Sequence, residues 1–203
     1  MWGSSRLYTR SSHFPIINDM NKAIKNSTVY HFADDTNLLF SHKNSNTLKK
    51  IMNKDLKSLY EWLCANRLSL NVGKTEFMIF RPPKKSMSNR IVLTLNRTKI
   101  YESTKIKYLG VIQDPHLTWK EHTCELSKKL NCAVGMLYKS RHYCPTSILK
   151  SLYYSIFNSH AAYGLPVWGY ADKKYTQKII NIQKKAIRAI TFSKFREHSS
   201  PPL

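Results

Sequence analysis

Residues 29–40 read Val29-Tyr30-His31-Phe32-Ala33-Asp34-Asp35-Thr36-Asn37-Leu38-Leu39-Phe40. Apolar and aromatic residues lie on both sides of two adjacent aspartates, Asp34 and Asp35. This pattern predicts a strand, a tight turn and a second strand, with the carboxylates at the turn. Paired carboxylates on a rigid hairpin are the ligands that a divalent-metal site for phosphoryl transfer requires. A solvated Asp-Asp turn is the alternative, because aspartate is common in turns.

The composition indicates a partner with a negative charge. The chain has 203 residues, with 33 Lys+Arg against 12 Asp+Glu and a formal net charge of +21. Such an excess is typical of a surface that meets a phosphate backbone or an anionic membrane face. Together with the paired aspartates, the charge favours nucleic-acid polymerisation.

We expect an intracellular protein, nuclear or cytoplasmic, with no membrane partner. No apolar run approaches the roughly 20 residues that span a bilayer, and residues 1–10 lack the apolar core of a secretion signal. The four cysteines show no CxxC spacing, which fits a reducing compartment. Cys124, Cys132, His142 and Cys144 match no closed zinc module, so we expect buried thiols and a surface histidine there.

The hydrophobic period divides the chain into a mixed α/β part, about residues 14–113, and an all-helical part, about residues 118–192, with irregular termini over 1–13 and 193–203. The fold class is therefore α+β. In the first part we expect an amphipathic helix that Asn46 caps and that ends near Asn66. A strand around Phe77 and Ile79, a hairpin around Asn96-Arg97 and a strand over 106–112 follow.

The second part is predicted to contain three helices. Thr118 and Glu121 have the spacing of a capping box at the start of the first helix. Pro145 opens the second helix, and Gly164-Leu165-Pro166 breaks it. The third helix carries four basic residues that we expect to point mostly outward: Lys178, Lys184, Lys185 and Arg188. Tyr153 and Trp168 are expected in the core, since aromatic residues at helical spacing are more often core than base-stacking groups.

Several segments, in order, resemble the reverse transcriptase of non-LTR retrotransposons, which are LINE-like elements, and its jockey-like group in particular. Phe32-Ala33-Asp34-Asp35-Thr36 looks like the catalytic FADD turn of that family. The segments that resemble its later motifs are Trp62-Leu63 with Asn66–Asn71 and Lys74–Phe80, Lys107–Val111, Leu117–His122, Tyr163–Gly169 and Ile182–Arg188.

The resemblance implies a partial polymerase palm, an antiparallel sheet with a helix, over 14–113, followed by a helical thumb bundle over 118–192. It implies RNA-directed DNA polymerase activity, a nucleotidyl transfer, with Mg²⁺ as cofactor. The implied partners are deoxynucleotides and an RNA template on a DNA primer, or an RNA–DNA duplex.

The resemblance also assigns roles to residues. Asp34 and Asp35 would be the catalytic metal ligands, and Lys74 would contact the phosphates of the nucleotide. Tyr108, Leu109 and Gly110 would form the primer grip, and the backbone of the nucleic acid would meet Lys178, Lys184, Lys185 and Arg188. The alternatives are an ordinary surface lysine at position 74 and a plain core strand with one glycine at 108–110.

The family's fingers, and a palm strand with a further catalytic aspartate, should precede the FADD turn. Only 33 residues precede Asp34, too few to hold them. We therefore expect a C-terminal palm and thumb fragment of a transposable element that does not polymerise alone, so that enzyme status stays open. The alternatives are a non-catalytic basic remnant that binds nucleic acid and a DNA-binding helical module over 118–192.

Overall fold

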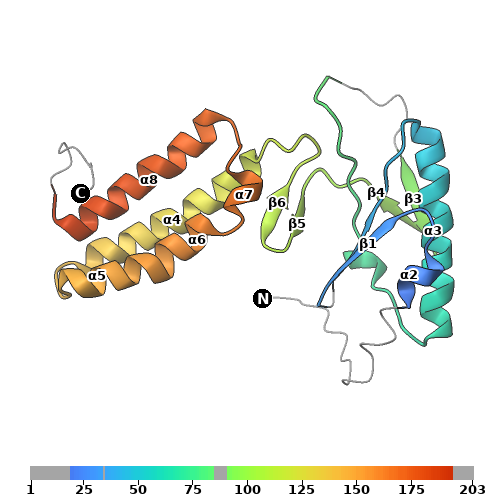
Figure 1. Ribbon diagram of the computed structural model, residues 1–203, viewed down its shortest axis with the longest axis horizontal. Coiled ribbons are helices and arrows are strands. Elements are labelled where there is room, and N and C mark those ends of the chain that lie inside the picture. Colours follow the sequence, from blue (N-terminus) through green and yellow to red (C-terminus); the bar gives the residue numbers. More distant parts are fainter. Residues whose placement is uncertain (1–18, 34, 85–90, 194–203) are drawn as a thin grey trace. The chain divides into compact units, whose positions relative to one another are not determined.

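The computed structural model describes residues 19–33, 35–84 and 91–193 (Figure 1). The chain forms two compact units, Met1–Thr104 and Lys105–Leu203. Helices are combined with two-stranded antiparallel sheets, which confirms the α+β class. The division into units falls before the hairpin over 106–113, a segment that we had grouped with the first part.

The first unit begins with helix α2, Met20–Ala23, and a hairpin of strands β1, Thr28–Phe32, and β2, Asp35–Leu39. The strands are antiparallel, with Phe32 opposite Asp35 and Thr28 opposite Leu39. The predicted strand–turn–strand is confirmed for the described residues, and Asp34 itself lies outside them.

Helix α3, Ser45–Ala65, is the long helix of this unit. The Asn44 side chain caps it by accepting hydrogen bonds from the backbone N–H groups of Asn46 and Thr47. Our prediction of Asn46 as the cap was therefore wrong by two residues. Asn44 has the extended backbone of an N-cap residue, whereas Asn46 is already inside the helix.

A second hairpin packs on α3. Strands β3, Val92–Leu95, and β4, Thr98–Tyr101, confirm the predicted hairpin. Asn96 and Arg97 both have positive φ, 45° and 64°, as a two-residue hairpin turn requires. The core of the unit contains the buried side chains of Met20, Ile24, Met52, Leu56, Leu59, Leu63, Phe77, Ile91, Leu93, Leu95 and Ile100.

The predicted strand around Phe77 and Ile79 does not form. A short 3-10 helix, η2, spans Val72–Lys74, and Phe77 then makes a single parallel bridge to Glu102. Pro82 and Pro83 follow closely, and they lack the N–H groups that a longer ladder would need.

The second unit starts with a hairpin of strands β5, Ile106–Tyr108, and β6, Val111–Gln113. The residue pattern had predicted one strand over 106–112. Leu109 and Gly110 have positive φ, 44° and 82°, and these two residues form the turn at which the chain reverses direction.

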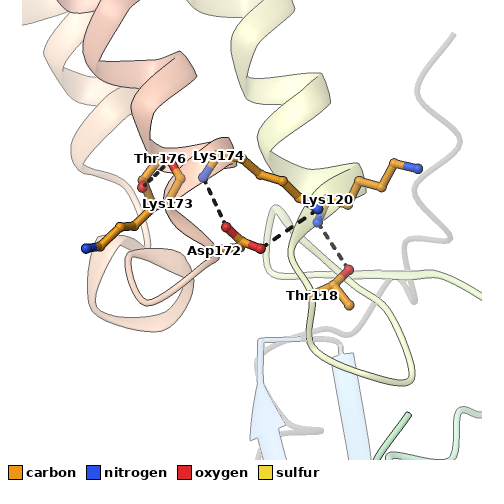
Figure 2. A network of polar contacts seen from close by, with 6 residues as sticks. All are labelled: Thr118, Lys120, Asp172, Lys173, Lys174 and Thr176. Atoms are coloured by element: carbon orange, nitrogen blue, oxygen red, sulfur yellow. Dashed lines mark hydrogen bonds and ion pairs between the residues drawn. The ribbon is translucent and has the colours of Figure 1, made fainter. Parts of the chain in front are cut away.

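Helix α4, Lys120–Ser140, follows, without the predicted capping box. Trp119 occupies the cap position with a left-handed backbone, φ 60°, and no side chain caps the helix from there. The Asp114 carboxylate instead accepts hydrogen bonds from the backbone N–H groups of Thr118 and Trp119, at 3.1 Å each. Thr118 therefore lies one residue too early to be the cap, and its hydroxyl accepts only a long 3.4 Å bond from the Lys120 N–H (Figure 2).

The remaining helices are α5, Thr146–Leu152, the π-helix η3, Tyr153–Asn158, α6, Ser159–Ala162, α7, Leu165–Trp168, and α8, Lys173–Thr191. The predicted break falls at Gly164, which has φ 65°. Asp172 caps α8 by accepting from the Lys174 N–H at 3.1 Å, and α4 and α8 begin beside each other (Figure 2).

Buried side chains of α4, α7, α8 and η3 make the core of this unit: Leu126, Leu130, Ala133, Val134, Leu137, Phe157, Trp168, Ile179, Ile182, Ala186 and Ala189. Trp168 is 2% exposed, so its prediction as core is confirmed. Tyr153 is half-buried and stacks on Phe157. Tyr138 on α4 is exposed.

Candidate polymerase site

Asp35 is the described half of the aspartate pair. It is the first residue of β2, it faces Phe32 across the turn, and it is exposed. Ala33 in the turn has φ 53°, a left-handed conformation that a hairpin turn of this length requires. His31 Nδ1 lies 3.1 Å from Thr36 Oγ1 and links the two strands beside the turn. A carboxylate in this place can bind a cation without first losing a buried partner.

A buried aspartate on α3 holds the start of this hairpin. Asp55 is 2% exposed, and its carboxylate accepts hydrogen bonds from the backbone N–H and side-chain amide of Asn26, at 3.0 and 2.6 Å. Asn26 lies two residues before β1. Our sequence reasoning missed this contact, although an acidic residue inside the apolar stripe of an amphipathic helix was a signal for it.

Lys74 ends the 3-10 helix η2 and is exposed. Its backbone N–H donates to the Asn71 carbonyl at 3.1 Å, and the next residue, Thr75, donates its hydroxyl to the same carbonyl at 3.1 Å. The lysine is thus attached to a closed turn rather than to an open loop.

The candidate primer grip is the turn of the β5–β6 hairpin. Tyr163 donates its hydroxyl to the Leu109 carbonyl at 2.6 Å. A Cβ atom at Gly110 would lie 3.1 Å from the ring of Tyr163, so a larger residue would push that ring away. Gly110 lies in the turn itself, between the paired residues Tyr108 and Val111. Tyr163 was missed as a site residue.

His122 holds the other side of the same hairpin. Its Nδ1 atom accepts a hydrogen bond from the Ile112 N–H at 3.3 Å, and its ring lies 5.7 Å from that of Trp168. Burial lowers the pKa of His122, and the nearby Lys129 ammonium lowers it further. A neutral ring with a free Nδ1 lone pair is the form that can accept this bond.

The basic residues of α8 differ in exposure. Lys178, Lys184 and Lys185 are exposed as predicted, whereas Arg188 is half-buried. Lys178 and Lys185 are seven residues apart, which puts them on the same face of the helix. Three further lysines that we had not singled out, Lys120, Lys173 and Lys174, lie at the neighbouring starts of α4 and α8 (Figure 2).

The candidate residues are divided between the two units. Asp35 and Lys74 belong to the first unit, and the primer-grip hairpin and α8 belong to the second. Within residues 19–33, 35–84 and 91–193, no group of three or more His, Cys, Asp or Glu side chains could hold a metal ion.

The cysteines do not match our expectation of buried thiols. Cys124 and Cys132 are exposed on α4, Cys144 is half-buried, and all four thiols are free. The two residues fall on the solvent side of the helix, because its buried stripe runs through Thr123, Leu126, Leu130 and Ala133. In the described part of the chain, no helix is long and apolar enough to cross a membrane.

Comparison with known proteins identifies the class. Residues 11–113 match the family model "Reverse transcriptase (RNA-dependent DNA polymerase)", a stretch that contains both the β1–β2 hairpin and Lys74. The chain therefore belongs to the reverse transcriptase family, in its non-LTR retrotransposon branch. Similar proteins from mobile elements support this branch, which confirms the resemblance seen in the sequence.

Three relatives come from mobile elements of Drosophila melanogaster. The "Probable RNA-directed DNA polymerase from transposon X-element" is 29% identical over 119 residues, which are 52% of this chain and 13% of that protein. The "RNA-directed DNA polymerase from mobile element jockey" and its counterpart from transposon BS are each 26% identical, over 79% of this chain and 18% of their own length. The chain thus spans less than a fifth of these relatives. No solved structure matches it significantly.

Proposed function

We propose that this chain carries the FADD turn, the nucleotide-contacting lysine and the thumb of a reverse transcriptase that copies RNA into DNA. The single observation that supports this most is the placement of Asp35. It heads β2 next to a two-residue turn, exposed, inside the stretch that matches the family. In this proposal residues 14–113 are palm and residues 118–192 are thumb.

Asp34 and Asp35 would hold a divalent cation, which we propose to be Mg²⁺. The fit rests on the chemistry of the donors, because carboxylate oxygens on a rigid hairpin suit a hard cation that binds one or two carboxylates. When bound, the cation supplies activation of the primer hydroxyl and charge neutralisation at the phosphates. Lys74 would add a positive charge for the nucleotide phosphates.

The β5–β6 turn would orient the primer end, and the exposed lysines of α8 would follow the backbone of the duplex. The orientation of the turn depends on Tyr163 and His122, which bond to Leu109 and Ile112. A turn held from two sides keeps the primer end in one place, and positioning of this kind lowers the barrier of a nucleotidyl transfer.

We propose further that these 203 residues, taken alone, bind a primer–template without extending it. Within residues 19–33, 35–84 and 91–193, no cluster of three ligands forms around Asp35, and a site without such a cluster cannot position the reacting groups. The second candidate function, a non-catalytic protein that binds nucleic acid, is favoured by the net charge of +21.

A binding and extension assay on the purified chain separates these functions. We expect a fluorescent RNA–DNA primer–template to bind with a steep salt dependence. In the polymerase proposal, Mg²⁺ changes the affinity for primer–template plus deoxynucleotide, and the Asp35→Asn variant removes this change. If Asp35→Asn leaves every Mg²⁺ effect intact, the non-catalytic function stands. Robust Mg²⁺-dependent incorporation would overturn the proposed inactivity, and absence of binding at low salt would overturn both functions.

A further inference from the structure

A groove rich in lysine lies on the first unit between α3 and the β3–β4 hairpin. It encloses about 830 Å³. Its walls are formed by one face of α3 and by the hairpin, and neither Asp35 nor Lys74 lines it. The lysines are Lys49 and Lys57 from the helix and Lys99 from the hairpin. We propose that this groove binds a strand of single-stranded RNA, as a site separate from the polymerase site.

The charge of the groove fits a phosphate backbone. A neighbouring hollow on the same helix is lined by Lys50 and Lys54 together with Lys49 and Lys57, so five lysines surround the two hollows. Among the residues that the structure describes, Glu61 is the one acidic side chain that lines the two hollows, and its carboxylate lies 3.8 Å from the Lys57 ammonium with both side chains largely exposed. An exposed pair of this kind is weak, so Lys57 can exchange it for a phosphate.

The spacing also fits a strand. Lys49 and Lys57 are eight residues apart, about 12 Å along a helix axis at 1.5 Å per residue. One strand of a duplex has a phosphate about every 3.4 Å of helix axis, and an extended single strand spaces its phosphates more widely, so about two or three phosphates fall over that length. Lysines one or two turns apart on α3 can therefore contact the phosphates of one nucleic-acid strand.

An exposed tyrosine favours a single strand over a duplex. Tyr101 of β4 lines the groove and is 61% exposed, whereas Tyr60 of α3 lines it while half-buried against the core of the unit. Aromatic rings beside a basic track stack with the bases of single strands. The bases of a duplex are already paired and stacked inside it, so such rings would have no partner there.

The groove is built on fixed elements. Asn53 accepts a hydrogen bond from the Thr94 N–H at 2.9 Å, which joins α3 to the hairpin at the floor of the groove. The Asn53 amide in turn donates to the Lys49 carbonyl at 3.0 Å, and the buried Leu95 lies beneath. Binding therefore requires ordering of lysine side chains only, with little movement of the backbone.

The experiment compares two triple variants of the full chain that lose the same charge. The groove variant is Lys49→Gln, Lys57→Gln and Lys99→Gln, and the control variant is Lys25→Gln, Lys139→Gln and Lys150→Gln, all at exposed positions. The probe is a fluorescent 12-nucleotide oligo(U), and its affinity is measured across a series of salt concentrations.

We expect the groove variant to reduce the magnitude of the slope of log K against log salt by about 2, since each lost contact to a single strand contributes about 0.7. The Tyr101→Ala variant should weaken binding by about five-fold or more without changing that slope, because stacking carries no counterion release. Circular dichroism of each variant checks that the helices remain folded.

Three outcomes would overturn the inference. The first is equal loss of RNA affinity in the groove and control variants, which would mean that net charge alone binds the strand. The second is an unchanged affinity in Tyr101→Ala, and the third is a groove variant that loses binding to phosphatidylserine vesicles while keeping the RNA. Loss of the Asp35-dependent Mg²⁺ effect has no bearing on this groove, so the two proposals fail separately.

Discussion

The Asp55→Ala substitution should release the hairpin that carries the paired aspartates. The Asp55 carboxylate accepts two hydrogen bonds from Asn26, at 3.0 and 2.6 Å, and is 2% exposed. Hydrogen bonds to a charged group contribute about 1.5–3 kcal/mol each. Asn26 is exposed, so its N–H groups regain water in the variant, and removal of the buried charge offsets part of the loss. The two bonds together would contribute about 3–6 kcal/mol, and after these offsets we expect a net destabilisation of about 2 kcal/mol.

Amide hydrogen exchange with mass spectrometry on the full chain measures this loss segment by segment. A loss of about 2 kcal/mol corresponds to roughly thirty-fold faster exchange of protected amides. We expect that increase in β1–β2 and α3, with α4 of the second unit unchanged as the internal reference. Asp55→Asn keeps one acceptor oxygen and should show about half the loss in free energy.

Glu61→Gln on the same helix is the matched control. The Glu61 carboxylate is exposed and lies 3.8 Å from the Lys57 ammonium. The free energy of opening that hydrogen exchange reports should therefore change by less than about 0.5 kcal/mol. Unchanged protection of β1–β2 in Asp55→Ala would refute the reasoning, because the carboxylate would then contribute nothing net to holding the strand. Equal loss in α4 would point instead to a general effect on the chain.

Three further predictions concern the second unit. Tyr163→Phe removes the 2.6 Å hydrogen bond to the Leu109 carbonyl, a loss of about 1 kcal/mol. Amide exchange in β5–β6 should therefore become about five-fold faster, while exchange in α8 stays unchanged. The pKa of His122 is lowered in the folded chain, whereas in the unfolded chain it has the ordinary value of about 6.5. The free energy of unfolding is therefore highest above about pH 6.5 and decreases as the pH falls from that value toward the lowered pKa of the folded chain. Urea unfolding at pH 5 and 7.5 should show this fall in the wild type and a smaller one in His122→Gln; equal falls would contradict it. Leu130→Ala, at a position 0% exposed, should cost about 2–5 kcal/mol in the urea unfolding of the second unit, and a cost below 1 kcal/mol would contradict the packing.

Periodicity and turn chemistry predicted the elements whose cause is local. The β1–β2 and β3–β4 hairpins were predicted because short apolar runs flank residues suited to tight turns, and the structure has them. The strand around Phe77 was wrong because an apolar run does not specify a pairing partner. Phe77 bridges only to Glu102, a residue 25 positions along the chain.

The sequence pattern also did not determine which residues cap the helices. Asn44 and Asn46 are both acceptable cap residues, and only the backbone conformation selects Asn44. At α4 the spacing of Thr118 and Glu121 fits a capping box, yet the Asp114 carboxylate takes the backbone N–H groups of Thr118 and Trp119. The Asp114 carboxylate, four or five residues before these N–H groups, therefore replaces the capping box that the spacing predicted.

The residues that hold the candidate site in place share one property that sequence reading misses. Asp55, His122 and Tyr163 each come from a helix or its end and bond to the backbone of a hairpin or of the segment before it. Each of them bonds to at least one main-chain group, and a main-chain partner leaves no mark in the pattern of side chains. The motifs of the family identify the turns that would meet substrate, whereas these three polar residues fix where the turns lie. Substitutions among them should therefore impair substrate positioning while the FADD turn, Lys74 and residues 108–110 remain unchanged.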